Sequence, residues 1–288
     1  MKRKTKIILI AIIVLIAIPF GFNALKTAMT PAVGILEIEG PIDDSIGYLG
    51  IIRQFEEDAN VRAVIIRLDS PGGKVGPSQE IYEALLKLKK EKPVIASMGS
   101  VSASGAYYIA CAADRIYALP GTLTGSIGVV LEFFDVTEGL QKLGVSSRSI
   151  TGGELKDAGS PFRHMTDKER RYFEYLARDV HDQFKDAVSR SRKLHRSKVD
   201  EYADGRVFTG RQALANGLID SLGGMDSAVE DAGKRAGIKG KPRIIKGEPE
   251  EGVWKDIERF IQSYAPISFG KGSAHLSRGF LRLEYSIQ

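Results

Sequence analysis

Cysteine and histidine are scarce in this chain of 288 residues, which has one cysteine and four histidines. A single cysteine cannot form an intramolecular disulfide, so the fold cannot depend on a disulfide framework. Neither residue type recurs at the spacing of zinc ligands, and the sequence has no glycine-rich phosphate loop. We therefore expect no metal and no organic cofactor. The apolar neighbours of Cys111 predict that its thiol is buried and unreactive.

The chain also has little excess charge of either sign, because 41 Lys and Arg residues against 36 Asp and Glu residues give a net charge of +5. Several of the positive charges lie in one N-terminal cluster, Lys2, Arg3, Lys4 and Lys6, and the remainder of the chain is nearly neutral. Proteins that bind nucleic acid usually carry a basic surface. We therefore expect no nucleic-acid partner.

The N-terminus carries a long uncharged run, residues 7–25, which is dominated by Ile, Leu, Val, Ala and Phe. At about 1.5 Å per residue, a helix of this length crosses a hydrocarbon core of roughly 30 Å. We predict one transmembrane helix, with the basic cluster on the cytoplasmic side and the rest of the chain on the extracytoplasmic side. The alternative is a cleaved signal peptide, although the run is longer than the usual apolar region of such a peptide.

The rest of the chain is long enough to bury a hydrophobic core. We predict a basic N-terminus and anchor over residues 1–26, a linker over 27–33, one folded domain over 34–245, and a C-terminal segment of uncertain structure over 246–288.

Apolar runs that are typical of buried strands alternate with amphipathic stretches that are typical of helices. Strands are expected at 32–40, 61–68, 93–98 and 115–119; helices are expected at 47–58, 78–90 and 166–195, with a further strand and helix within 204–224. The spacing of Thr166 and Glu169 predicts a capping box at the start of the long helix. Strands this apolar imply a parallel sheet covered on both faces, so the sequence predicts an α/β fold.

Two turns offer the elements of a nucleophilic site. The first, residues 69–75, contains Gly73, whose N–H group has no side chain to obstruct it. The second, residues 99–110, carries serines at the start of an expected helix, where free N–H groups and the helix dipole stabilise a developing alkoxide. The residues alone do not distinguish Ser104 from Ser100 and Ser102 as the nucleophile.

A serine nucleophile needs a base, and the sequence offers two candidates. His164 follows a glycine-rich irregular segment, whereas His181 and His195 belong to the charged helix and are expected on the surface. Lys156 is the stronger candidate because it stands alone in that irregular segment, outside the charged runs. A lysine acts as a base when burial lowers its pKa toward neutrality.

Five ordered motifs resemble the signal peptide peptidase A family, in its short membrane-anchored bacterial form, and together they extend over most of the chain beyond the anchor. They are residues 69–73 (DSPGG), 102–108 (SASGAYY), 123–129 (LTGSIGV), 156–161 (KDAGSP) and 205–210 (GRVFTG).

The resemblance implies a Clp-peptidase/crotonase-like fold of repeated β-β-α units and a Ser-Lys dyad. Ser104 matches the family's nucleophile, Lys156 its general base, and Gly73 with Gly105 its oxyanion-hole donors. Ser126 matches a hydroxyl that orients the lysine. The chain departs from the family where Ala106 replaces a frequent glycine, and a helical first turn accommodates that alanine.

The resemblance also implies a serine endopeptidase of the bacterial cytoplasmic membrane that cleaves apolar peptides, in particular the remnants of signal peptides. A single chain resembles half of the family's doubled long form, which implies a homo-oligomer, with an octamer as the expected state. Two alternatives keep the fold and change the function: a crotonase-like acyl-CoA enzyme, and a scaffold related to stomatin-associated membrane proteases.

Overall fold

The computed structural model describes residues 30–248 and the backbone of 283–285. The predicted transmembrane helix and its alternative, a signal peptide, lie outside these residues. Within the described part of the chain, no helix combines the length and the apolar character needed to cross a membrane.

An eight-stranded sheet forms the centre of the molecule, and its main path follows the order β10-β1-β2-β4-β5-β9. Its strands are β1 (Ala32–Glu39), β2 (Val61–Ser70), β4 (Val94–Ala103), β5 (Arg115–Ala118), β6 (Leu123–Gly125), β8 (Val207–Thr209), β9 (Ser221–Leu222) and β10 (Arg243–Lys246). All pairs are parallel except β6 with β8. The predicted α/β class and the first four predicted strands are confirmed.

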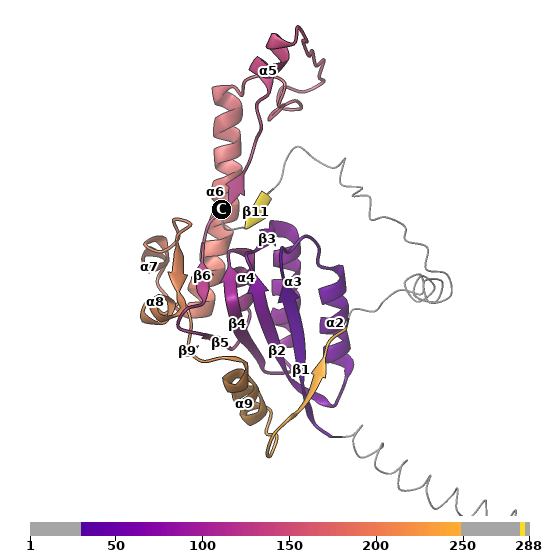
Figure 1. Cartoon of the computed structure of the whole chain (residues 1–288), viewed down its shortest axis with the longest axis vertical. Helices are drawn as coiled ribbons and strands as arrows, with labels where there is room; N and C mark the ends of the chain where they lie inside the picture. The colour runs from indigo at the N-terminus through magenta and orange to yellow at the C-terminus, as the bar shows by residue number, and fades with distance from the viewer. Residues whose placement is uncertain (1–29, 249–282, 286–288) are drawn as a thin grey trace, which may run out of the picture.

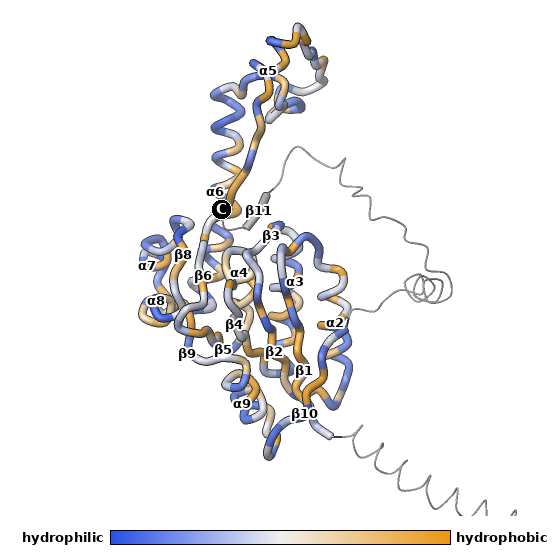
Figure 2. Tube along the Cα trace, viewed as in Figure 1, coloured by the Kyte–Doolittle hydropathy of each residue, from blue (hydrophilic) through white to orange (hydrophobic). Residues whose placement is uncertain are grey.

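Helices cover both faces of this sheet, as the apolar strands predict. One core joins the sheet to α2 (Ile46–Glu57), α3 (Val75–Leu88), α4 (Gly105–Ala110) and α6 (Asp167–Arg192), and a smaller core joins it to α9 (Met225–Arg235). Val64, Ile65 and Ile66 in β2 are completely buried because each side of the strand packs against a layer of helix. The hydropathy colouring shows these central strands as mainly apolar (Figure 2).

The second serine turn differs in detail from the prediction. Strand β4 continues to Ala103, past the expected strand end at Met98, and the helix that follows, α4, spans only Gly105–Ala110. The extension has a structural reason: β4 pairs with β5 through its first half and with β6 through residues 101–103, so its last residues find a second partner.

A long arm projects from the body of the molecule (Figure 1). It comprises β7 (Val130–Leu131), α5 (Thr137–Lys142), the irregular segment 143–166, and the N-terminal half of α6. The predicted capping box is present, since the Thr166 hydroxyl accepts from the Glu169 N–H and the Glu169 carboxylate accepts from the Thr166 N–H. Phe133 and Phe173 pack with ring centroids 4.4 Å apart, beside a cavity of about 410 Å³.

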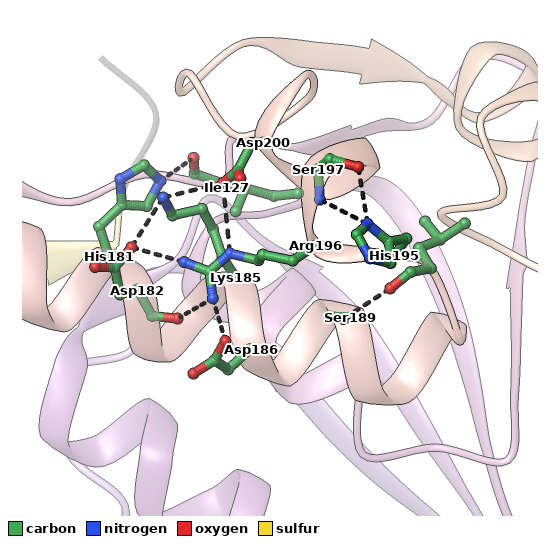
Figure 3. A network of polar contacts seen from close by, with 11 residues as sticks. Ile127, His181, Asp182, Lys185, Asp186, Ser189, His195, Arg196, Ser197 and Asp200 are labelled. Atoms are coloured by element: carbon green, nitrogen blue, oxygen red, sulfur yellow. Dashed lines mark hydrogen bonds and ion pairs between the residues drawn. The ribbon is translucent and has the colours of Figure 1, made fainter.

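Ion pairs fasten the C-terminal half of α6 to α7 (Arg196–Asp200) (Figure 3). Arg196 binds Asp182 at 2.7 Å and also Asp186, while Lys185 bridges Asp182 and Asp200 at 2.9 and 3.2 Å. The helix is also joined to the body, because His181 contacts the Ile127 carbonyl at 3.2 Å. The root of the arm is therefore fixed. A short helix, α8 (Gly210–Ala215), completes this side of the body.

Candidate active site

Three parallel strands end close together, and each leads into a predicted site residue. Strand β2 is followed by the turn that carries Gly73, β4 is followed by Ser104, and β6 is followed by Ser126. Because β2, β4 and β6 are neighbours in the sheet, their carboxyl ends form one edge. Ligands of open α/β sheets bind at such an edge.

Ser104 occupies a strained turn between β4 and α4. Its backbone has φ 54° and ψ −119°, a region that non-glycine residues rarely adopt, and its N–H donates to the Gly125 carbonyl at 2.8 Å. The residue is only 1% exposed, and its hydroxyl has no hydrogen-bond partner among the described residues. A strained turn from strand to helix, with a polar group left free, is the backbone arrangement that presents a nucleophile.

The turn of Ser104 is held from behind by α4, every residue of which is buried. Tyr107 donates from its hydroxyl to the Leu218 carbonyl at 2.8 Å, and Tyr108 packs against Tyr82 and Phe184. Gly105 is the first residue of this helix, so its N–H has no partner one turn earlier in the helix. The structure therefore places one backbone donor directly after Ser104.

Gly73 lies in the two-residue strand β3 (Gly73–Lys74), beside Ile42. Ile42 donates to the Gly72 carbonyl and accepts from the Lys74 N–H, at 2.9 and 2.8 Å, so the N–H of Gly73 faces the opposite side. A Cβ atom at Gly73 would lie 2.3 Å from the Ile42 carbonyl oxygen. Only glycine fits here without a shift of the backbone.

Ser126 also has a left-handed backbone, with φ 49°, and it is buried. Its N–H donates to the Arg206 carbonyl at 2.9 Å. Since Ala103 pairs with Gly125 in register, Ser126 follows directly after the residue that accepts from Ser104. The fold thus brings together Ser104, Gly105 and Ser126 at this edge of the sheet.

Strand β3 belongs to a second, three-stranded sheet of order β3-β11-β7. Strand β11 (Leu283–Tyr285) comes from the C-terminal end of the chain and lies antiparallel to both neighbours. Tyr285 pairs with Gly73, and Leu283 pairs with Leu131. An extended segment therefore lies directly beside Gly73, and Figure 1 shows β11 next to β3.

Lys156 lies far from this group, in the segment between α5 and α6 that forms the end of the arm (Figure 1). It is exposed, and it lines a shallow cavity with Ser147, Ser149 and residues 157–162. The structure of one chain therefore does not bring Lys156 to Ser104. Nor is the Lys156 side chain buried within one chain.

The described histidines and the cysteine differ in how well their positions match the predictions. His164 lies on the arm, where its Nδ1 contacts Asp135 at 2.7 Å. His195 is exposed, as predicted, whereas His181 is half-buried, and burial lowers its pKa. Cys111 is buried as predicted, and desolvation raises its thiol pKa to about 12, so the thiol is inert.

Sequence reasoning missed the three-stranded sheet. Strands of two or three residues carry no periodic signal, and the partners of β11 lie more than 150 residues away from it in sequence. It also missed the contacts that Arg163 makes with Asp157 and Glu169.

Comparison with known proteins identifies the class of enzyme. The sequence model of Peptidase family S49 matches residues 86–239, a segment that includes Ser104, Ser126 and Lys156. The chain belongs to this family and is therefore a peptidase.

Within the family, the resemblance to signal peptide peptidase A is confirmed by the names of its relatives. The chain is 34% identical to a proposed signal peptide peptidase SppA of Enterococcus faecium, over 65% of this chain and 55% of that one. It is 40% identical to the chloroplast serine protease SPPA of Arabidopsis thaliana, over 65% of this chain and 28% of the relative. It is also 40% identical to a proposed protease of Synechocystis, over 74% of this chain and 77% of that protein.

Proposed function

We propose that this chain is a membrane-anchored serine endopeptidase that uses Ser104 as its nucleophile and Lys156 as its general base. The observation that carries the proposal is the strained, buried turn of Ser104, whose hydroxyl has no partner among the described residues. A polar group buried without a partner costs free energy, and such costs are concentrated at functional sites. The α/β sheet with its site at the carboxyl ends of the strands agrees with a Clp-peptidase/crotonase-like fold.

The proposed reaction has two steps. The Lys156 amine takes the proton of the Ser104 hydroxyl as the oxygen attacks a peptide carbonyl, and the N–H groups of Gly73 and Gly105 stabilise the oxyanion. The protonated lysine then gives its proton to the leaving amine. Water, activated by the same lysine, hydrolyses the acyl-enzyme, and Ser126 orients the lysine.

A second copy of the chain supplies Lys156 in this proposal. Within one chain the lysine is on the exposed end of the arm, and the root of the arm is held by the ion pairs around Arg196. The arm also exposes large apolar side chains, including Phe134, Leu143 and Ile150, which are typical of a surface that packs against another subunit. A ring of such copies, with an octamer as the expected state, would bring each arm to a neighbouring Ser104 and bury the lysine there.

The substrate class is inferred from the position of β11 between β3 and β7. A peptide in extended conformation would bind there as an added strand, in the place that β11 occupies, with its backbone beside Gly73. This mode favours unfolded peptides over folded proteins. Together with the predicted N-terminal anchor, it supports apolar remnants of signal peptides as substrates, on the extracytoplasmic face of the bacterial membrane.

The position of β11 between β3 and β7 gives a direct test. Because β11 competes with substrate in this proposal, ending the chain at residue 282 should lower KM for a fluorogenic apolar peptide by roughly threefold to tenfold, with little change in kcat. Glu284→Pro is the matched variant, since it removes the central N–H of β11 and keeps the full length. An unchanged KM in both variants would show that the substrate binds elsewhere.

The function itself is tested by cleavage of the same peptide, and of a synthetic signal peptide, by the full chain in detergent. We expect cleavage of both and no hydrolysis of an acyl-CoA thioester. Turnover of the thioester without peptide cleavage would instead support the crotonase-like alternative.

A further inference from the structure

The side chain of Arg163 joins the irregular segment that carries Lys156 to the start of the long helix. Its Nη2 donates to the Asp157 carbonyl at 2.7 Å, and its Nε donates to the Asp157 carboxylate at 3.0 Å. Asp157 is the residue directly after Lys156. The guanidinium therefore holds both the backbone and the side chain of the lysine's neighbour.

The other side of the same guanidinium binds Glu169. Nη1 and Nη2 of Arg163 donate to the two carboxylate oxygens at 2.9 and 2.5 Å. This fork geometry is one that arginine forms and lysine cannot reproduce. Glu169 is only 3% exposed, and the Arg163 bond, more than any other cause, lowers the pKa of its carboxyl to about 2. The carboxylate thus stays ionised and paired at any physiological pH.

Glu169 is itself fixed by the start of α6. It accepts from the N–H and the hydroxyl of Thr166 at 2.9 and 3.0 Å, which closes the capping box. The chain of contacts runs without interruption from the first turn of α6 through Glu169 and Arg163 to Asp157. Several other bonds of the Lys156 segment are local turns, such as Lys156 N–H to Gly153 carbonyl at 3.1 Å and Ser160 N–H to Asp157 carbonyl at 3.2 Å. Asp157 also accepts from the exposed Ser149 hydroxyl at 3.3 Å, and the Pro161 carbonyl accepts from the Val136 N–H at 2.8 Å.

We propose that Arg163 is a positioning residue for the general base: it locks the turn that carries Lys156 onto the capped end of α6, so that the arm presents the lysine in one orientation. This inference rests on the proposed role of Lys156. It explains why an exposed, irregular segment can carry a catalytic side chain, which must be held within a fraction of an ångström. Arg163 acts through Asp157 and touches neither substrate nor Ser104 in this proposal.

The test uses the full chain and two variants that leave the helix cap intact. Asp157→Asn removes the carboxylate on the lysine side and keeps the Arg163–Glu169 pair, while Arg163→Lys keeps a positive charge beside Glu169 and loses the fork. We expect kcat to fall roughly tenfold in each, with KM within about twofold, because a misplaced base affects the chemical step more than binding. In a Lys156→Ala background, neither variant should lower the residual rate further.

Lys168→Ala is the matched control. Lys168 also joins this segment to α6, through Glu154 at 2.5 Å, but both side chains are exposed. Exposed pairs contribute little to stability, so this variant should keep the wild-type kcat. Equal loss in Lys168→Ala and Asp157→Asn would overturn the proposal, since any loosening of the segment would then have the same effect.

Two possible results of this experiment distinguish a failure of the positioning role from a failure of the proposed Ser-Lys dyad. If Lys156→Ala loses activity while Asp157→Asn and Arg163→Lys keep full kcat, the dyad stands and the positioning role is refuted. If Lys156→Ala keeps activity, the dyad is refuted and the positioning role with it. Light scattering is recorded on every variant, and loss of assembly in Asp157→Asn would assign the network to subunit contact and overturn the proposal.

Discussion

Replacing Ser104 with alanine is expected to lower peptide cleavage by roughly 10⁴-fold or more, and Lys156→Ala by roughly 10³-fold or more. The reason is that the hydroxyl and the amine act on the same proton. For the same reason, the double variant should be no slower than Ser104→Ala alone. The measurement is kcat/KM for a fluorogenic apolar peptide, with the full chain in detergent.

The chain offers one control variant for Ser104 and one for Lys156. Ser102 lies two residues before Ser104 in β4, is buried, and also has a hydroxyl without a hydrogen-bond partner among the described residues. Ser102→Ala should therefore keep activity if the strained turn, and not burial alone, defines the nucleophile. Lys142→Ala, at the exposed end of α5, is the control for Lys156. Equal losses in Ser102→Ala and Ser104→Ala would contradict the assignment of the nucleophile.

Two inactive variants are expected to restore activity when they assemble together. If the lysine comes from a neighbouring copy, a Lys156→Ala chain provides Ser104 and an adjacent Ser104→Ala chain provides Lys156. Random assembly of equal amounts should then give about a quarter of the wild-type sites, because half of the chains carry the serine and half of their neighbours carry the lysine. The measurement is the activity of coexpressed, differently tagged variants after purification on both tags.

The matched control coexpresses Ser104→Ala with the Ser104→Ala/Lys156→Ala double variant, which contains no serine nucleophile and should stay inactive. Activity that is recovered in the mixture of Lys156→Ala with Ser104→Ala, and not in the control mixture, supports a site shared between copies. No recovery, from mixtures that light scattering shows to be assembled, would mean that both residues act within one chain and that the arm must fold back toward the body.

Several parts of the fold could be predicted because their signals are local. The apolar run of β2 and the Thr166–Glu169 spacing each depend on neighbouring residues, and both predictions are confirmed. The strain at Ser104 could not be predicted in this way. Its φ of 54° results from the path of β4, which must pair with β6 through residues 101–103 and then turn at once into α4.

The residues of the proposed site were named from motifs, but their spatial relations were not contained in those motifs. Gly73, Ser104 and Ser126 lie at one edge of the sheet because the strands that precede them, β2, β4 and β6, are adjacent and parallel. Lys156 is separated from them because β7 and α6 carry its segment outward on an arm. A motif specifies residue types in order along the chain, and it does not specify which strand lies beside which.

By itself, the sequence determined the α/β class, the positions of the main strands and helices, the buried cysteine and the family of the peptidase, because each depends on local patterns or on ordered motifs. The tertiary structure alone decided that Ser104 is strained and that its hydroxyl has no partner within the described part of the chain. It also decided that β11 lies beside Gly73, that Arg163 holds the Lys156 turn, and that Lys156 stands apart from Ser104 within one chain. These features depend on contacts between residues distant in sequence, which only the packing of the complete chain establishes.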